Sequence, residues 1–270
     1  TAARTINDPL KGVDYVQADL TTAAGGEALA KAAIERLGGI DILAHVIGGS
    51  ASPAGGFVAL TDDHWLAELN LNLLATVRLD RLLIPPMLER GKGGVVHVTP
   101  IHSVLPVPES TTGYAAAKAA IYGLTRTLAL EGTRYGINVN AMAPGALTRM
   151  TGDVLGDASP TADLVGMSGA DLEAQMGPHQ VAPAVVFLAH ESCTLNGETL
   201  SAAGGRVGRA FFAVTRGIYD DALTPEVVAA RLAEIVDETD YLVPVDVGDE
   251  MNLLMPNLTP KPRFGEERDR

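Results

Sequence analysis

The sequence predicts a doubly wound α/β fold, in which helices cover both faces of a parallel sheet. Short runs that are apolar throughout alternate along the chain with longer segments of helical periodicity, which is the pattern of strands and crossover helices. The chain has 270 residues, of which 47% are hydrophobic and 20% charged. This length and composition are sufficient for one large buried core.

The predicted elements follow in regular order. Strands are expected at 13–20, 40–47, 95–99, 137–144 and 198–205. Helices are expected between and after them, at 26–37, 62–90, 112–134, 160–176 and 179–191. Because ligands of such sheets bind beyond the carboxyl ends of the strands, we expect the functional residues just after Ile47, Thr99 and Ala143.

The domain organisation is predicted to be simple. Residues 1–205 form the main domain, and residues 206–270 form an extension packed on the same domain. Within the extension, Thr224 and Pro225 are typical of the first turn of a helix, which is expected at 224–238.

Charge and composition exclude several classes of protein. The 33 acidic and 20 basic residues leave a net charge of −13, which disfavours nucleic acid and anionic membranes as partners. No apolar run reaches the length of a membrane span. The single Cys193 allows no internal disulfide, so a cytoplasmic location is expected. The six His show no HxxxH or HxH spacing, so no metal site is expected.

The motif YAAAK at 114–118 carries the sharpest chemical signal. In a helix, Tyr114 and Lys118 share one face, one turn apart. An ammonium group beside a phenol favours the phenolate, so the pKa of Tyr114 is expected to fall and the pair could act as an acid/base unit. On spacing alone, such a pair is more often a half-buried Tyr beside a solvated Lys.

The ordered set of motifs resembles the short-chain dehydrogenase/reductase superfamily, whose fold is Rossmann-like, and the resemblance covers about residues 1–205. It implies that this region is a dinucleotide-binding, catalytic domain. Tyr114 corresponds to the acid/base, and Lys118 to the residue that tunes it and holds the nicotinamide ribose. In HWLAELNLNLLA, Asn72 corresponds to the Asn that organises a proton-relay water. Asn70 is the alternative for this role if the register is shifted. A purely structural alternative is that Asn72 hydrogen-bonds to a nearby helical carbonyl.

The resemblance also implies a set of cofactor-binding residues. In MAPGALTRM, Pro144 and Gly145 are expected to form a turn beside the nicotinamide, and Thr148 to bind its carboxamide. Asp19 corresponds to an acidic residue near the adenine, with capping of the following helix as its structural alternative. In IDILAHVIGG, only Gly48 matches the end of the family's Asn-Asn-Ala-Gly, where its backbone could approach a ribose closely.

The sequence departs from the family pattern at three places. Pro100 occupies the column of the catalytic Ser, and Ser103 is the candidate replacement, with a solvated loop Ser as the alternative. No strand is followed by Gly-x-x-x-Gly-x-Gly, so we expect a further N-terminal segment with the phosphate-binding turn to precede Thr1. Arg4 lies where a 2′-phosphate would bind, which favours NADP(H) over NAD(H), although it could be an ordinary surface Arg.

These observations lead to one leading hypothesis and two alternatives. The leading one is an NADP(H)-dependent oxidoreductase that interconverts a small-molecule carbonyl and a secondary alcohol. An apolar cover predicted at 149–180 favours an apolar substrate, and a homodimer or homotetramer is expected. The C-terminal part also resembles the dehydrogenase domain of multifunctional β-oxidation enzymes, so an NAD-dependent 3-hydroxyacyl thioester dehydrogenase is the second hypothesis. The third is a catalytically weak or inactive relative that binds a nucleotide or a protein partner.

Overall fold

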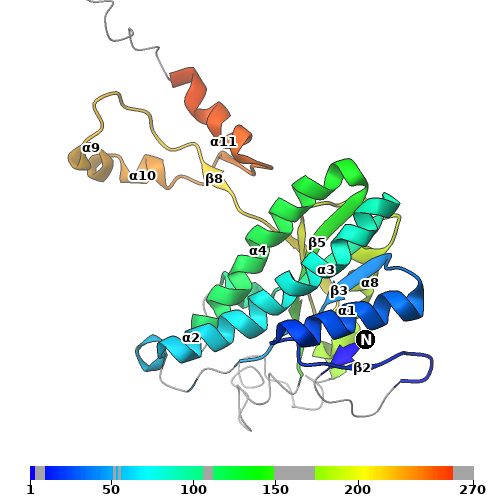
Figure 1. Ribbon diagram of the computed structural model, residues 1–270. Coiled ribbons are helices and arrows are strands. Elements are labelled where there is room, and N and C mark those ends of the chain that lie inside the picture. The colour runs from blue at the N-terminus through cyan, green and yellow to red at the C-terminus, as the bar shows by residue number, and fades with distance from the viewer. Residues whose placement is uncertain (4–9, 51–52, 54–55, 106–111, 149–173, 258–270) are drawn as a thin grey trace, which may run out of the picture. The chain divides into compact units, whose positions relative to one another are not determined.

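The chain divides into two compact units, Thr1–Ala210 and Phe211–Arg270. The computed structural model describes residues 1–3, 10–50, 53, 56–105, 112–148 and 174–257 (Figure 1). The first unit ends five residues later than the domain boundary expected at 205, because a strand at Arg206–Ala210 still pairs with the sheet. The packing of the extension on this unit stays a prediction.

A five-stranded sheet forms the centre of the first unit, in the order β3-β4-β5-β6-β7. Four strands are parallel: β3 (Ile42–His45), β4 (Gly93–Val98), β5 (Ile137–Gly145) and β6 (Thr199–Ala203). β7 (Arg206–Ala210) is antiparallel to β6 and was not predicted. A separate parallel pair joins β1 (Ala2–Ala3) to β2 (Val16–Gln17), so little of the strand expected at 13–20 is regular.

Helices cover both faces of this sheet, as the sequence predicts. Among the described residues of the first unit, the helices are α1 (Ala23–Leu37), α2 (Asp62–Leu69), α3 (Ala75–Arg90), α4 (Thr112–Gly132) and α8 (Ala182–Ala189). One core lies where α1, α3 and α4 meet β4 and β5 through residues such as Leu79, Val95 and Ala129. A second core packs α8 against the other face, around Val96 and Met142. Alternation along β4 therefore sends neighbouring valines to opposite faces.

The helix expected at 62–90 is one continuous rod with a wider turn inside it. A π-helical segment, η2 (Asn70–Leu74), separates α2 from α3. The rod begins with a capping box in which Thr61 and His64 satisfy each other's backbone N–H groups, and it ends at Gly91 with a φ of 68°. π-helical turns often occur at functional sites because they redirect side chains. This one contains Asn72.

Short helical turns connect the main elements of the first unit. Four 3₁₀ segments lie at Phe57–Ala59 (η1), Ile101–Ser103 (η3), Thr133–Tyr135 (η4) and Pro178–Gln180 (η5). Most of the helix expected at 160–176, and most of the cover expected at 149–180, lies outside the described residues.

In the second unit, the elements within residues 211–257 are all short. They are β8 (Val214–Thr215), α9 (Pro225–Ala230), α10 (Leu232–Ile235), β9 (Tyr241–Leu242), α11 (Val247–Leu254) and η6 (Met255–Asn257). Thr224 is an N-cap, as predicted, and its hydroxyl accepts from Val227 N. The prediction of a single helix at 224–238 is wrong, because the helix is interrupted at Arg231 (φ −108°, ψ 19°). Among the described residues, no helix is long and apolar enough to cross a membrane.

Candidate active site

Lys118 is fixed at the carboxyl ends of two neighbouring parallel strands. Its Nζ donates to Ile47 O (2.6 Å), just past β3, and to Val98 O (3.2 Å), at the end of β4. The residue is only 2% exposed, and this burial lowers the pKa of Lys118 to about 8. Two of the three ammonium N–H donors are used by these carbonyls, which leaves one to reach a ligand. A buried cation at this edge of a parallel sheet makes the surroundings of Lys118 the candidate binding site.

Tyr114 lies one turn before Lys118 on α4 and is also buried. Burial, together with the nearby Glu68 carboxylate, raises the pKa of Tyr114 to about 12. The expected net fall of this pKa is therefore wrong for the chain described here. The physical reason is that the desolvation of the phenolate and the negative charge of Glu68 both favour the protonated phenol. Tyr114 is consequently held in its protonated, phenol form.

Asn72 connects the π-helical turn to the loop after β3. Its Nδ2 donates to Glu68 Oε2 (2.7 Å), to Glu68 O (3.2 Å) and to Gly49 O (2.9 Å), while Oδ1 accepts from Gly49 N (3.1 Å). A Cβ added at Gly48 would lie 3.1 Å from both Asn72 Oδ1 and Lys118 Nζ. A Cβ here would be in tight contact with both side chains, so Gly48, Asn72 and Lys118 line one small region. The structure thus brings these three predicted residues together.

The sequence reasoning missed Glu68, which is fully buried beside these groups. Its Oε1 accepts from the hydroxyl of Ser50 at 3.2 Å, and its Oε2 accepts from Asn72. A charged residue at 68 fits the solvent face of an amphipathic helix, so no local signal placed it inside. Asn70, the register-shifted alternative to Asn72, points elsewhere: it donates to Thr21 O (3.0 Å) and accepts from Arg78 (2.7 Å).

The segment at the end of β4 uses its hydroxyl groups internally. Ser103 Oγ donates to Pro100 O (2.7 Å), and Thr99 Oγ1 donates to Lys118 O (2.7 Å). Both side chains are buried, so the alternative of a solvated loop Ser for Ser103 is wrong. In this arrangement, Ser103 gives its hydroxyl hydrogen to the backbone of Pro100, the residue that it was expected to replace. Its assignment as a substrate donor stays a prediction.

Pro144 and Gly145 belong to β5 itself, so the turn expected at these residues is not there. They pair with Ala202 and Ala203 of β6, and a Cβ at Gly145 would lie 2.8 Å from the Ala203 Cβ. Gly145 therefore permits the close approach of β5 and β6. The Pro-Gly dipeptide in the sequence predicts a turn and does not reveal this strand contact. Thr148 follows the strand and is exposed.

Asp19 lies before α1 and organises a local turn. Its Oδ1 accepts from Thr21 N (3.0 Å) and from Thr21 Oγ1 (2.7 Å). The N-cap of α1 is Thr22, which accepts from Gly25 N, so the capping role suggested for Asp19 is wrong. Arg4 lies outside the described residues, and the cofactor-binding roles of Asp19, Pro144, Gly145 and Thr148 stay predictions.

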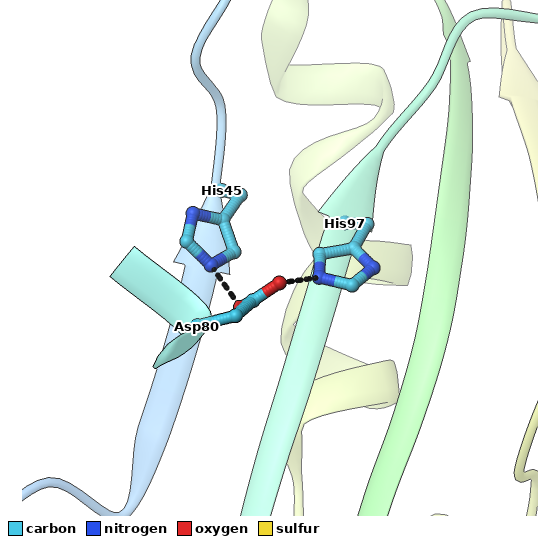
Figure 2. Close-up of side chains that lie close together, drawn as sticks. All are labelled: His45, Asp80 and His97. Carbon is cyan, nitrogen blue, oxygen red and sulfur yellow. Dashed lines mark hydrogen bonds and ion pairs between the residues drawn. The ribbon is translucent and has the colours of Figure 1, made fainter. Parts of the chain in front are cut away.

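A second polar cluster lies in the layer between the sheet and the helices. It consists of His45 on β3, Asp80 on α3 and His97 on β4, all of them buried (Figure 2). His45 Nε2 lies 2.8 Å from Asp80 Oδ1, and His97 Nε2 lies 3.2 Å from Asp80 Oδ2. Burial alone would raise the pKa of Asp80, but its hydrogen bonds with the two imidazoles hold this pKa at about 2. Burial lowers the pKa of His45, so this imidazole is neutral.

A surface pocket is found at the opposite edge of the sheet. Asp41, Lys92, Gly94 and Asn138 are among its lining residues, at the amino ends of β3, β4 and β5. Parallel sheets bind ligands at their carboxyl ends, so the Tyr114–Lys118 region is the better candidate site.

The fold and this site define a class of protein: a Rossmann-like α/β protein with a buried Tyr-Lys pair at the carboxyl edge of its parallel sheet. A family model described as "Enoyl-(Acyl carrier protein) reductase" matches residues 1–206. The chain belongs to the short-chain dehydrogenase/reductase family of oxidoreductases. Members of this family bind a nicotinamide cofactor.

Three comparisons show how far the similarity extends. A Mycobacterium tuberculosis relative named as a short-chain type dehydrogenase/reductase is 34% identical over 68% of this chain, which spans 59% of that relative's length. Peroxisomal multifunctional enzyme type 2 of mouse is 29% identical over 82% of this chain and 28% of its own length. The structure of L-sorbose reductase from Gluconobacter frateurii, complexed with NADPH and L-sorbose, is similar with a TM-score of 0.59 and 28% identity, over 71% of this chain and 75% of that one.

Proposed function

We propose that this protein is an NADP(H)-dependent oxidoreductase that interconverts a carbonyl and a secondary alcohol of an apolar small molecule. The observation that carries the proposal is the fixation of Lys118 by two strand-end carbonyls, one helical turn from the buried phenol of Tyr114. This arrangement holds a cation and a proton donor together at the edge where a parallel sheet binds ligands.

The residues at this edge fit a nicotinamide cofactor. The backbone at Gly48 leaves the space that a Cβ would fill, between Asn72 and Lys118. The remaining N–H donor of Lys118 can bind a ribose hydroxyl there, and the family relationship supports this assignment. When bound, the nicotinamide supplies or accepts the hydride. Arg4 and the NADPH bound by L-sorbose reductase support NADP(H) over NAD(H).

In the reduction direction, Tyr114 protonates the substrate oxygen. Its raised pKa suits this role, because the phenol stays protonated until charge develops on the oxygen beside it. Lys118 stabilises the resulting phenolate and holds the ribose. Asn72 and Glu68 lie in the same buried network, where Ser50 is exposed and connects Glu68 to solvent. This network offers a route for proton replacement at Tyr114.

Tyr114→Phe provides the direct test. The substitution removes one hydroxyl, so it should lower turnover at least about 100-fold and leave dinucleotide affinity nearly unchanged. Turnover is measured on a panel of apolar ketones and aldehydes, and affinity by quenching of the single Trp65. NADPH should bind more tightly than NADH in both proteins. A variant that retains more than a few per cent of the rate would exclude Tyr114 as the acid, and equal affinities would exclude the NADP(H) preference.

A second candidate function is an NAD-dependent 3-hydroxyacyl thioester dehydrogenase. The specific support is the similarity to the peroxisomal multifunctional enzyme, which covers 82% of this chain and so extends past the first unit. Including 3-ketoacyl thioesters in the substrate panel separates the two candidates. A preference for these thioesters together with NADH would replace the leading proposal.

A third candidate is a relative that binds a nucleotide or a protein partner without turnover. Pro100 supports it, because this residue offers no hydroxyl and no N–H to the substrate oxygen. Dinucleotide binding without reduction of any carbonyl in the panel would favour this candidate over both enzymes.

A further inference from the structure

We propose that His45, Asp80 and His97 bind one divalent transition-metal ion, such as Zn²⁺, in the core of the first unit. This site lies outside the Tyr114–Lys118 region and is independent of the proposed function. It also differs from the expectation drawn from local His spacing, since the two histidines belong to different strands.

The register of the sheet brings the ligands together. His45 and His97 are directly paired residues of β3 and β4, and Asp80 reaches them from α3. One ligand atom from each residue can be chosen so that all three lie within 4.8 Å of one another. Figure 2 shows the two imidazoles turned toward the same carboxylate, each facing a different oxygen. Asp80 therefore joins the two imidazoles, and the three residues offer two nitrogens and a carboxylate oxygen to one ion.

The spacing of these atoms is close to what a metal ion requires. Zinc binds imidazole nitrogen and carboxylate oxygen at about 2.0–2.2 Å, which places neighbouring ligand atoms of a tetrahedral site about 3.3 Å apart. The two nitrogen–oxygen distances are 2.8 Å and 3.2 Å. The ligand atoms lie up to 4.8 Å apart, so the imidazole rings must turn toward each other when an ion binds.

The groups behind His97 orient it as a ligand. Its Nδ1 lies 2.9 Å from Thr125 Oγ1, and that hydroxyl donates to Ile121 O at 2.7 Å. With the hydroxyl hydrogen used in this way, Thr125 accepts from Nδ1–H, and Nε2 is the ring nitrogen that faces Asp80 and is placed to bind a metal ion. Metal-ligating histidines are commonly held by such a hydrogen bond at the second ring nitrogen.

The charge around the cluster sets the metal preference. Asp80 carries the single negative charge of the cluster, and Lys118 lies within electrostatic reach of His45. A divalent ion would therefore not be retained by charge alone, so its affinity must come from the two imidazoles. Imidazole favours zinc, copper and nickel, whereas magnesium and calcium prefer all-oxygen sites. We therefore expect Zn²⁺ to bind and Mg²⁺ and Ca²⁺ to fail.

Calorimetric titration of Zn²⁺ into the full chain tests the proposal. The protein is purified without a histidine tag and treated with a chelator beforehand. One equivalent should bind, and Mg²⁺ or Ca²⁺ should give no heat of binding. Asp80→Asn keeps the shape of the side chain and removes its charge, so it should weaken binding at least about 100-fold. Thr125→Val should weaken it about 10-fold by releasing His97.

His190→Asn is the matched control for His45→Asn, because His190 is exposed and its imidazole hydrogen-bonds to the neighbouring Ser192, away from the cluster. The control should retain the binding that His45→Asn loses. Should the core variants fail to fold, X-ray absorption spectroscopy of the Zn²⁺-loaded natural sequence must show two imidazole ligands. Absence of one-equivalent binding, or binding that persists in both Asp80→Asn and His45→Asn, would leave the cluster as a hydrogen-bonded network without an ion and overturn the proposal.

Discussion

At the scale of single residues, Lys118 is placed where its chemistry and its burial oppose each other. The ammonium group must be charged to hold a ribose and to stabilise a phenolate. Burial disfavours that charge and lowers the pKa of Lys118 to about 8, although the carbonyls of Ile47 and Val98 accept two of its hydrogen bonds. The site therefore reduces the stability of the folded chain at neutral pH in exchange for a reactive cation.

This opposition predicts a pH dependence of stability. Between pH 8 and the ordinary Lys pKa of 10.5, the unfolded chain holds a proton on Lys118 that the folded chain has lost. Since the unfolded state binds more protons, stability from this group rises with pH in that window and is constant below it. Relative to Lys118→Met, the natural sequence should gain roughly 2 kcal/mol of unfolding free energy from pH 8 to pH 10. Urea unfolding of both proteins at each pH measures the difference, and a constant difference would contradict the prediction.

Pro100 is the residue at which this chain departs most clearly from its family. Because Ser103 and Thr99 donate their hydroxyl hydrogens to backbone carbonyls, the loop offers no free hydroxyl donor from these two residues. Pro100→Ser should therefore raise kcat/KM about 100-fold for a reducible carbonyl, with a smaller change in dinucleotide affinity. Ser103→Ala is the companion variant. If it abolishes activity and Pro100→Ser does little, Ser103 is already the donor.

At the scale of the elements, the end of α3 contacts the end of η4, just before β4 and β5 begin. Gly136, with a φ of 70°, ends the short η4 helix, and a Cβ there would lie 2.5 Å from Gly91 O. Gly91 itself ends α3 with a φ of 68°. Both glycines adopt a left-handed backbone, and at Gly136 the close approach to Gly91 O also leaves no space for a side chain.

Gly136→Ala should lower the unfolding free energy by about 2 kcal/mol or more, because it combines a strained backbone with a steric clash. Gly123→Ala is the control: Gly123 lies within α4, and an added Cβ would contact nothing within 4 Å. That change should stabilise the chain by about 0.5–1 kcal/mol through helix propensity. Chemical unfolding measures the change in unfolding free energy for both variants. Equal effects of the two substitutions would refute the role assigned to Gly136.

At the scale of the whole molecule, we predict self-association through α4 and the rod formed by α2 and α3. Leu130 on α4 and Leu66 on α2 are 60% and 63% exposed, which is unusual for leucines in helices that also cover a sheet. The chain should sediment as a dimer or tetramer at micromolar concentration, and Leu130→Glu should shift it toward the monomer. An exposed Lys31→Glu variant on α1 is the control and should leave the mass unchanged. A monomeric natural sequence would rule out this interface.

Sequence periodicity predicted the fold well where the signal is local. The helices at α1, α3 and α4 and the strands at β3 to β6 lie within a few residues of their expected positions. The prediction failed at β7 and in the second unit, where elements are short and depend on pairing with distant residues. It also failed at Pro144 and Gly145, because a dipeptide typical of turns is equally suited to a strand that must approach its neighbour closely.

The sequence by itself determined the order of the elements, the Tyr114–Lys118 pair on one helix face, and the family to which the chain is related. All of these depend on periodicity and spacing over a few turns of chain. Only the tertiary structure decided which carbonyls hold Lys118, that Glu68 is buried beside Tyr114, and that His45 and His97 face one carboxylate. These contacts arise from strand register and from helix packing across the sheet, which join residues far apart in sequence, so no local pattern encodes them.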